Sequence, residues 1–529
     1  MLLDVRPDHL RMVRDILQKH VPQYEVWAFG SRTKWTAKDH SDLDLCVVSD
    51  KPLNFSVMGA MAEDFSDSDL PWKVDVVDWA TTSESFRKII KRDKVVVQEA
   101  GRGGGKAGEW KTMPLENCMA AIIDYRGKSP AKTTFGVPLV TAKIVKGGRI
   151  EQPEEFIAEA DYIEWMRRGM PEPGDIVMTT EAPLGEVAQL DGRKVALAQR
   201  VITLRGKPDI LDNTFLKFLL QSNPVQEELR SRGTGTTVIG IRQSELRKVS
   251  LTLPPFPEQK AIAHILGTLD DKIELNRRMN ATLETMARAL FQSWFVDFDP
   301  VRTKLDGLKP AGLDAATAAL FPAHFQDSPL GHIPQGWKAG TLSEGFNLTM
   351  GQSPPGNTYN EDGNGIPLYQ GRTDFGFRFP TRRIYCTAPT RYAKPGDTLV
   401  SVRAPVGDIN MADEECCIGR GVAAVRHKSG AVSFTYHAME NLSPDFALFE
   451  GEGTVFGSIN KQNFEDLRFV MPPPEIVAAY EHLAKPLDDQ ISTLEHQSRT
   501  LATLRDTLLP RLMSGELRIT GNSRDKNRR

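Results

Sequence analysis

One long helical pattern occurs twice in this sequence, and it limits the folds that the chain can adopt. The first copy begins at Pro257 and the second at Pro474, and in both copies apolar residues recur in alternating steps of four and three. Such a heptad repeat is typical of a helix that packs along its length against another helix. Both copies also contain Leu-Asp-Asp, at 269–271 and 487–489. We therefore predict two related long helices rather than two unrelated amphipathic ones.

Polar residues stand at a few positions of these apolar seams. Asn276 and Asn280 lie in the first seam, where a polar side chain suits a role in setting helix register or partner choice at some cost in stability. The alternative is that both asparagines face solvent. Arg505 interrupts the second seam, and Leu504 beside it can fill the gap.

The segments that flank the two helices are repeated as well. The stretch around Pro183, PGDIVMTTEAPLGEVAQL, parallels the stretch around Pro405, PGDTLVSVRAPVGDINMA. The later stretch GTGTTVIGIRQSELRK parallels GEGTVFGSINKQNFED. Each half of the chain is therefore predicted to contain a β-rich domain, then a Pro-rich turn, then a long helix. A loop-like connector is expected between the halves.

The first hundred residues form a separate unit with a different pattern. A helix is predicted over 7–20, and strands over 26–29, 43–48 and the segment WKVDVVDW. Gly30-Ser31 follows the first strand, and its backbone N–H groups and hydroxyl are suited to phosphate. Asp42 and Asp44 are two residues apart, so their carboxylates point to the same face of a strand. With Asp75 on a neighbouring strand, they could hold two Mg²⁺ ions at a triphosphate.

This unit resembles the minimal nucleotidyltransferases of the DNA polymerase β-like superfamily. Gly30, Ser31, Asp42, Asp44 and Asp75 fill the family pattern of Gly-Ser, Asp-x-Asp and a later strand Asp. The resemblance implies nucleotide binding by Gly30 and Ser31, and a catalytic, metal-binding role for the three aspartates. Mg²⁺ and a nucleoside triphosphate would be its cofactors, and a partner protein or RNA hydroxyl its acceptor. An inactive adaptor domain, or a surface Asp-Leu-Asp without catalytic meaning, is the alternative.

Residues from Trp110 to about Thr520 resemble the specificity subunit of type I restriction–modification enzymes. The motifs SWFVDFDPVR and FPAHFQDSPLGHIPQGW, the paired Gly-Thr and Pro-Pro segments and the Leu-Asp-Asp helices carry this resemblance. It implies an α+β multidomain fold, in which two β-rich target-recognition domains alternate with two long antiparallel coiled-coil helices. The expected boundaries are 1–100 for the nucleotidyltransferase-like α/β domain, 101–109 for a Gly-rich linker, 110–256 and 336–473 for the recognition domains, 257–298 and 474–515 for the helices, 299–335 for the connector and 516–529 for a basic tail.

The same resemblance implies that the chain binds double-stranded DNA and assembles with two methyltransferase subunits and, through the complex, with restriction subunits. The specificity region would need no cofactor. Net charge is −3, so DNA binding must come from local patches. Candidate DNA contacts are the basic and amide residues of the expected loops: Arg126, Lys128, Gln199, Arg200, Arg232 and Gln243 in the first domain, and Arg372, Arg378, Arg403, Arg420 and Lys461 in the second. For any single one of them, a solvated surface residue is the alternative.

Several absences bound the activity of this chain. The sequence contains no Asn/Asp-Pro-Pro-Tyr/Phe motif for base methylation and no Walker motif, so methyl transfer and cleavage are expected on partner chains. The five cysteines form no Cys-x-x-Cys, which argues against zinc or a disulfide framework. No stretch is apolar enough for a membrane span or a signal core, and we expect a cytoplasmic protein.

Overall fold

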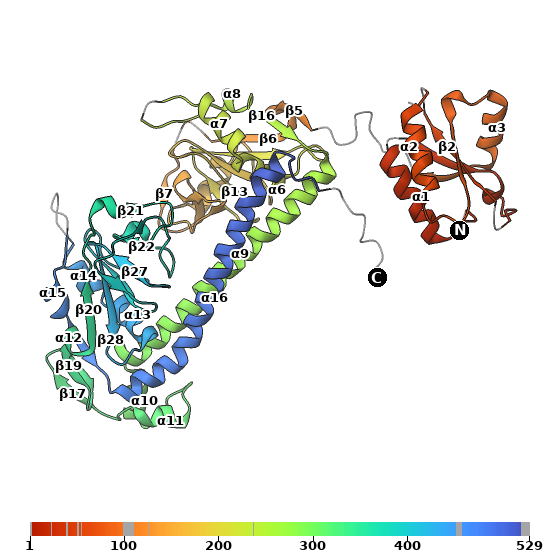
Figure 1. Ribbon diagram of the computed structural model, residues 1–529. Coiled ribbons are helices and arrows are strands. Elements are labelled where there is room, and N and C mark those ends of the chain that lie inside the picture. Colours follow the sequence, from red (N-terminus) through yellow and green to blue (C-terminus); the bar gives the residue numbers. More distant parts are fainter. Residues whose placement is uncertain are drawn as a thin grey trace. The chain divides into compact units, whose positions relative to one another are not determined.

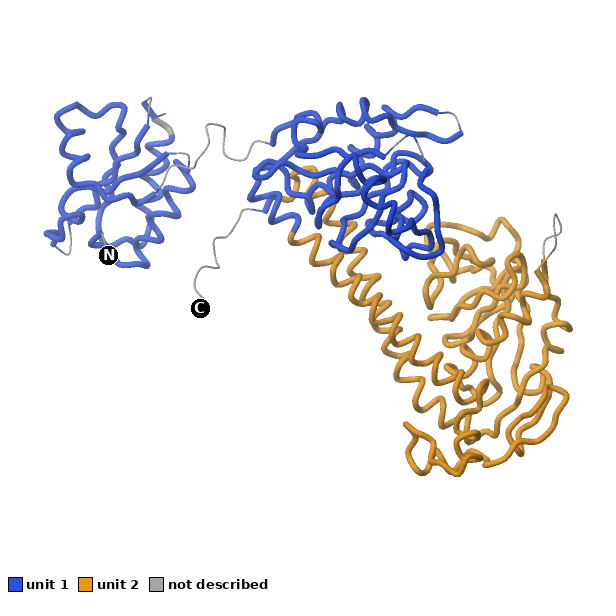
Figure 2. Tube along the Cα trace, turned by 180° about the vertical axis from the view of Figure 1, so that it is seen from behind, with its two compact units in different colours: residues 1–263, 518–529 blue, residues 264–517 orange. Residues whose placement is uncertain are grey.

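The computed structural model describes residues 3–22, 24–38, 41–49, 52–53, 55–98, 110–125, 127, 129–235, 237–450 and 457–519 of the 529-residue chain. It divides into two compact units, residues 1–263 with 518–529, and residues 264–517 (Figure 2). The predicted Gly-rich linker at 101–109 lies outside the described residues, as does the predicted basic tail from residue 520 onward.

The first hundred residues build a four-stranded sheet with the order β3-β2-β1-β4 (Figure 1). Its elements are α1 (Pro7–His20), β1 (Glu25–Phe29), η1 (Ser31–Thr33), β2 (Leu43–Val48), α2 (Phe55–Ser66), β3 (Val74–Asp78), η2 (Trp79–Thr81), α3 (Glu84–Asp93) and β4 (Val95–Gln98). Strands β2 and β3 run parallel, whereas β1 is antiparallel to both β2 and β4. Val13 and Leu17 of α1 pack on Val26 and Leu45 of the sheet, as the apolar spacing of the helix predicts.

The first β-rich segment, residues 110–256, follows. Its strands are β5 (Lys111–Pro114), β6 (Met119–Asp124), β7 (Lys132–Thr133), β8 (Val137–Val140), β9 (Val145–Lys146), β10 (Arg149–Ile150), β11 (Phe156–Ile157), β12 (Ile176–Thr180), β13 (Leu184–Gln189), β14 (Ala196–Leu197), β15 (Val201–Gly206) and β16 (Ser250–Leu253). Its helices are α4 (Leu115–Cys118), α5 (Tyr162–Trp165), α6 (Asn213–Gln221), α7 (Asn223–Arg232) and α8 (Gln243–Leu246).

The second β-rich segment, residues 336–473, lies in the other unit. Its strands are β19 (Lys338–Thr341), β20 (Phe346–Met350), β21 (Tyr359–Asn360), β22 (Ile366–Tyr369), β23 (Tyr385–Cys386), β24 (Tyr392–Ala393), β25 (Thr398–Val402), β26 (Val406–Met411), β27 (Cys416–Ile418), β28 (Val422–His427) and β29 (Arg468–Met471). Its helices are α12 (Leu342–Gly345), α13 (Val432–Asn441), α14 (Ser443–Ala447) and α15 (Lys461–Glu465), with the 3₁₀ turns η6 (Gly356–Thr358) and η7 (Arg372–Asp374).

The two β-rich segments repeat one architecture. The sheet β6-β15-β12-β13 of the first corresponds to β20-β28-β25-β26 of the second, and the pair β5-β16 corresponds to β19-β29. In both, the Ala-Pro-x-Gly turn connects two antiparallel strands whose register shifts by one residue next to the turn. Both turns also contain a cis peptide bond, at Ala182-Pro183 and at Ala404-Pro405. The internal repeat read from the sequence is therefore a repeat of structure.

Two long helices follow the β-rich segments, as the heptad pattern predicts. They are α9 (Phe256–Phe291) and α16 (Pro474–Met513), and they lie side by side within the second unit (Figure 1). The side chains that join them occur in reversed order: Asp270 of α9 binds Arg505, Asn280 binds Glu495, and Ala287 accepts a hydrogen bond from Tyr480. The described portions of the two helices in this unit thus run in opposite directions.

The two seam asparagines are buried between the helices. Asn276 donates to Gln497 Oε1 at 2.8 Å and to Ser498 Oγ at 3.2 Å, and Asn280 donates to Glu495 Oε1 at 2.8 Å. Neither side chain is exposed to solvent, so the solvent-facing alternative is wrong. The expectation for Leu504 is also wrong, because that side chain is 47% exposed. Arg505 itself occupies the gap, through its ion pair with Asp270 at 2.7 Å.

The connector between the halves is more ordered than a loop. After α9 it contains a π-helical turn (η5, Gln292–Val296), α10 (Asp299–Leu305), α11 (Ala315–Leu320) and the hairpin β17 (Phe325–Ser328) with β18 (Gly331–Pro334). Phe298, Phe321 and Ile333 are buried in one core with Trp294 of the turn and Trp337 beyond the hairpin. Burial of these apolar side chains explains why a segment with several prolines and glycines is structured.

None of the described helices is both long and apolar enough for a membrane span. The five cysteines are all described, and each of them is buried and free. Burial raises the pKa of Cys46 to about 12 and that of Cys118 to about 11, so these thiols are poor nucleophiles.

Candidate functional site

Carboxylates of the N-terminal sheet converge at one end of two parallel strands. Asp44 is the second residue of β2 and Asp75 the second residue of β3, and the two stand opposite each other in the register of the sheet. Asp42 immediately precedes β2. The sheet thus brings together three side chains that the sequence places 33 positions apart at most.

The surroundings of Asp44 show how close this arrangement is. Burial raises the pKa of the Asp44 carboxyl, and the negative charges of Asp75 and Asp42 raise it further. Gly30 directly follows β1, whose last residue Phe29 pairs with Asp44, and it has a φ of 87°. A Cβ at this position would collide with the Asp44 carboxylate. A side chain at Gly30 would therefore fill the space in front of the acid group.

The Gly30-Ser31 turn is held by its own short-range hydrogen bonds. Ser31 begins the 3₁₀ turn η1, and its carbonyl accepts the N–H groups of Lys34 and Thr36, both at 3.2 Å. The Thr33 hydroxyl donates to the Gly30 carbonyl at 2.8 Å. All of these bonds use carbonyl oxygens of the turn.

Sequence reasoning missed the part played by Arg32. This side chain is 6% exposed and lies over the Trp72 ring at 4.5 Å. Its guanidinium donates to the carbonyl of Ser41 at 2.6 and 3.0 Å and to the carbonyl of Asp4 at 3.0 Å. Arg32 thus holds the residue directly before Asp42. Only its place inside the Gly-Ser-Arg motif could have drawn attention to it.

Asp75 and Asp78 both lie on β3, but they have different partners. Lys73 pairs with Asp75 at 2.6 Å, and this hydrogen bond raises the pKa of the Lys73 ammonium. Asp78 instead is buried and accepts hydrogen bonds from Ser49 and from the N–H groups of Leu53 and Ala80. Asp78 therefore closes the local turn, whereas Asp75 faces Asp44.

The donor set fits a divalent cation with a phosphate ligand. Carboxylate oxygens are the ligands that Mg²⁺ prefers, and a bound cation would relieve the repulsion that Asp44 experiences from Asp75 and Asp42. The absent Cβ at Gly30 leaves room for a phosphate beside these groups.

Each β-rich segment carries a second kind of candidate site, and the corresponding surface occurs once in each half of the chain. In the first segment, Glu181 of the cis-proline turn bridges to Gly240 of the later Gly-Thr loop. In the second, Arg403 of the equivalent turn bridges to Ser458. A cleft of about 460 Å³ lies beside the first turn, between Pro183, Arg230 and residues 237–239.

Most of the predicted DNA contacts lie on or near this surface. Arg200, Arg372, Arg403, Arg420 and Lys461 are exposed, and Gln199, Arg232 and Gln243 are half-buried. Several already have partners within the chain: Arg200 pairs with Glu181 at 2.7 Å, Arg232 with Glu228 at 2.9 Å and Arg372 with Asp408 at 3.1 Å. Arg420 donates to the Ser353 hydroxyl at 3.2 Å, and Lys461 pairs with Glu465 at 3.4 Å. Arg126 and Lys128 lie outside the described residues.

Arg378 is placed differently from the other candidates, and the structure corrects this prediction. Its side chain is 1% exposed and pairs with Glu284 of α9 and Asp488 of α16. A guanidinium that is buried between two carboxylates has no surface to offer a base edge. Its place in a loop of the sequence gave no sign of this burial.

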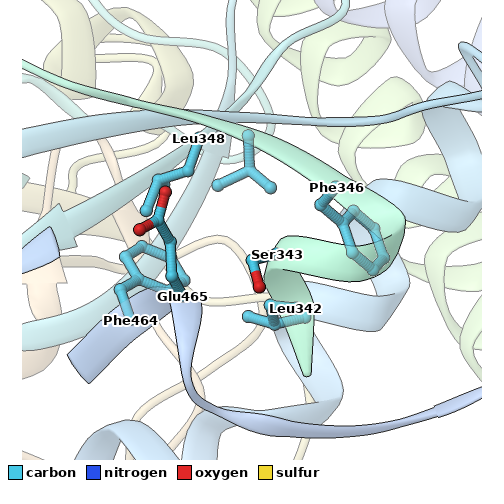
Figure 3. A pocket seen from close by; sticks show the side chains of 7 residues that line it. Leu342, Ser343, Phe346, Leu348, Phe464 and Glu465 are labelled. Carbon is cyan, nitrogen blue, oxygen red and sulfur yellow. The ribbon is translucent and has the colours of Figure 1, made fainter. Parts of the chain in front are cut away.

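Figure 3 shows a pocket in the second β-rich segment. Its lining consists of Leu342, Ser343, Phe346, Leu348, Val425, Phe464 and Glu465. Leu342, Phe346 and Phe464 are also members of the hydrophobic core of this unit. The pocket is therefore a gap in the packing of the core, and its apolar lining does not suit a nucleotide.

Two family profiles match different parts of the chain. The profile described as "Type I restriction modification DNA specificity domain" matches residues 128–285, and the profile described as "Polymerase beta, Nucleotidyltransferase" matches residues 12–101. The second match covers the sheet that carries Asp42, Asp44 and Asp75.

Individual relatives match the same two parts. The putative type I restriction enzyme MjaX specificity subunit of Methanocaldococcus jannaschii is 25% identical over 429 residues, which cover 78% of this chain and 94% of that protein. The probable protein adenylyltransferase MntA of Haemophilus influenzae is 56% identical over 97 residues, which cover 18% of this chain and 85% of that protein. Among solved structures, the HsdS subunit from Thermoanaerobacter tengcongensis is 25% identical over 77% of this chain and 97% of that chain, with a TM-score of 0.28.

Proposed function

We propose that this chain reads a bipartite site in double-stranded DNA, because it belongs to the family of type I restriction–modification specificity subunits. A polymerase β-like nucleotidyltransferase domain occupies its N-terminal end. Each β-rich segment would read one half of the site, the first over residues 110–256 and the second over 336–473. The two parts of the chain are argued separately below, since they carry different chemistry.

One observation carries the DNA-reading proposal: a repeated frame presents different side chains at equivalent positions. Counted from the equivalent strands and helices, Glu181 corresponds to Arg403, Gln199 to Arg420, and Gln243 to Lys461. Arginine pairs best with guanine, and glutamine with adenine. A shared frame with different polar groups is what two readers of unlike half-sites require.

The helices would act as the spacer between the two readers. We assign α9 and α16 to an antiparallel coiled coil that fixes the number of unread base pairs between the half-sites. The same helices would bind two methyltransferase subunits, and restriction subunits would join through that complex. Because the proposed target is cellular DNA, we place the assembly in the cytoplasm.

Methylation mapping tests this proposal. The chain is co-expressed with its neighbouring methyltransferase, and every methylated position of the host DNA is sequenced. We expect a two-part motif whose second half relaxes in Arg403→Ala, because a lost base contact costs about 1–3 kcal/mol of discrimination. Gln199→Ala should relax the other half. Unchanged motifs in both variants, or loss of both halves in each, would contradict the assignment.

For the N-terminal domain we propose Mg²⁺-dependent transfer of a nucleotidyl group to a hydroxyl. Gly30 and Ser31 would bind the triphosphate through backbone N–H groups and the serine hydroxyl, and Asp42, Asp44 and Asp75 would hold the metal. When bound, Mg²⁺ would neutralise phosphate charge and polarise the reacting phosphorus. Lys73 would orient the Asp75 carboxylate through its ion pair, and Arg32 would hold Asp42 in place through the Ser41 carbonyl. The likeness to a probable protein adenylyltransferase favours ATP and a protein acceptor.

Labelled nucleotide distinguishes this activity from an inactive domain. The full chain is incubated with Mg²⁺, ATP labelled at the α-phosphate and the proteins encoded beside it. Label should appear on one of these proteins, and Asp42→Ala combined with Asp44→Ala should abolish it. Equal labelling by the double variant, or by wild type without a divalent cation, would refute the assignment. Label on RNA rather than protein would correct the acceptor.

A further inference from the structure

A buried arginine joins the second β-rich segment to both long helices. One terminal nitrogen of Arg378 donates to Asp488 Oδ1 of α16 at 2.8 Å, and the other contacts Glu284 of α9. The guanidinium also lies 3.9 Å from the centre of the Tyr436 ring of α13. We call Arg378, Glu284 and Asp488 the Arg378 bridge. All of its members are less than a tenth exposed, so water contributes little to this contact.

The backbone of Arg378 is fixed to the sheet that precedes α13. Its carbonyl accepts the N–H of Met411, at the end of β26, at 2.9 Å. The carbonyl of Gly376 accepts the Asn410 side chain of the same strand at 3.0 Å. Phe379 packs with Met411 and Tyr436 in a small core. The segment that carries Arg378 is therefore held against the sheet, so the position of the guanidinium and the position of the sheet are coupled.

Other contacts hold the same segment to the helices, but at a different place. Phe434 packs on Phe295 and Tyr480 in an aromatic cluster, and Glu481 accepts the N–H groups of residues 432–434 at the start of α13. Asp488 is eight residues beyond Tyr480, which is about 12 Å along a helix. Apolar packing is not directional, whereas a guanidinium between two carboxylates accepts a narrow range of geometries. The Arg378 bridge therefore adds a second directional contact to the hydrogen bonds of Glu481, and two separated attachments restrict the tilt of the segment on the helices more than one does.

The sequence of the first half differs from that of the second at the positions of this bridge. Asp270 occupies the place of Asp488 in the first Leu-Asp-Asp block, and it pairs with Arg505 of α16. When the two helices are aligned on their Leu-Asp-Asp blocks, the residue of the second helix that corresponds to Glu284 is Ala502. Alanine has no carboxylate with which to pair an arginine. Among the contacts that the structure describes, the bridge belongs to the second β-rich segment.

We propose that Arg378 is a positioning residue that fixes the second recognition segment at one orientation on the helices, and so sets how strictly the spacer length of the DNA site is enforced. The inference rests on the proposed DNA-reading function. The Arg378 bridge would affect which spacing between the half-sites is accepted, whereas the base contacts would determine which half-site sequences are accepted. Loss of the bridge should broaden the accepted spacing without changing either half-site.

The test uses the full chain with its methyltransferase and duplexes that carry both half-sites. The duplexes have the natural spacer or a spacer that is one or two base pairs shorter or longer. The decisive variant combines Arg378→Met with Glu284→Gln and Asp488→Asn, because this combination leaves no unpaired buried charge. Arg382→Met is the matched control, since Arg382 is an exposed arginine four residues away that pairs with Glu414.

We expect wild type and Arg382→Met to methylate the natural spacer alone, and the triple variant to lose about tenfold of this discrimination, a change of the size of one mismatched base pair. Wild-type discrimination in the triple variant would overturn the proposal. If that variant does not fold, Arg378→Lys takes its place, because lysine keeps the charge but cannot span both carboxylates. A loss of spacer discrimination in Arg378→Lys would then support the proposal, and wild-type discrimination would overturn it. Failure of the wild-type chain to prefer any duplex would instead refute the DNA-reading function itself.

Discussion

At the scale of single residues, Asp44 has the most informative surroundings. Its pKa is raised above the ordinary carboxyl value of 3.8 by burial and by the charges of Asp75 and Asp42. The folded domain therefore binds a proton at Asp44 more readily than the unfolded chain does. The contribution of Asp44 to the stability of the domain falls as pH rises from 3.8 through the raised pKa, because the charged form is disfavoured only in the folded state.

Asp44→Asn should remove this pH dependence. We expect the variant to have a higher melting temperature than wild type at pH 7 without metal, and to gain less from added Mg²⁺. Thermal unfolding of the full chain from pH 3.5 to 8, with and without Mg²⁺, measures both effects. Asp69→Asn, at an exposed carboxylate of the same domain, is the control and should follow wild type. A metal response in Asp44→Asn equal to that of wild type would contradict the site.

Arg32 is the second residue whose replacement should be costly. Arg32→Met would leave the partly buried carbonyls of Asp4 and Ser41 without these donors. We expect a loss of about 2–3 kcal/mol in the free energy of unfolding of this domain, the usual cost of removing a charged donor. Urea unfolding followed by tryptophan fluorescence would show it, since Trp72 lies against Arg32. A loss below about 0.5 kcal/mol would mean that water replaces the guanidinium.

At the scale of elements, the helix seam contains polar groups that cost stability. The side-chain oxygens of Asn276 and Asn280 are buried, and neither has a hydrogen-bond partner among the described residues. Both amide nitrogens nevertheless find acceptors on α16. This pattern agrees with a role in register, in which a specific contact is retained although an apolar residue would be more stable.

Replacing both asparagines by leucine should therefore stabilise the helices. Asn276→Leu with Asn280→Leu removes two unpaired buried oxygens, and we expect a gain of about 1–3 kcal/mol in the free energy of unfolding. Guanidinium titration followed by circular dichroism gives the value. Thr285→Leu, at an exposed position of α9, is the control for added apolar area. A less stable double variant would show that the hydrogen bonds outweigh the unpaired oxygens.

At the scale of the whole molecule, the N-terminal domain is self-sufficient. Among the described residues, its sheet has no strand from beyond residue 98, and its two core clusters contain no residue beyond Val97. The nucleotidyl transfer that we propose for it also differs in chemistry from the DNA reading that we propose for the remainder. Joining the two in one chain would bring a nucleotidyl-transfer activity to the same complex as the DNA reader.

Deleting residues 1–109 should leave DNA reading intact. We expect the shortened chain, co-expressed with the methyltransferase, to give the same methylated motif at the same occupancy as the full chain. Sequencing of modified bases measures this directly. Any change in the motif would show that the N-terminal domain takes part in reading DNA, and any loss of occupancy would show that it takes part in assembly.

The sequence by itself determined the local elements and the repeat. Apolar spacing predicted α1, β2 and the two long helices, and the aligned Ala-Pro-x-Gly turns predicted that both halves share a frame. The spacing of Gly30, Asp42, Asp44 and Asp75 was enough to propose the acidic site. These features depend on neighbours in the chain, and their physical causes act over a few residues.

Only the tertiary structure decided which polar groups are buried, and against what. Arg378 and Arg403 both stand in loops of the sequence, yet one pairs with residues 94 and 110 positions away and the other is exposed. The same holds for Arg505, whose partner Asp270 is 235 positions away, and for the connector that the sequence suggested was a loop. The cost of burying a charged side chain depends on whether a carboxylate lies beside it in the fold. The partners of Arg378 and Arg505 are far away in the sequence, so local sequence patterns do not reveal them.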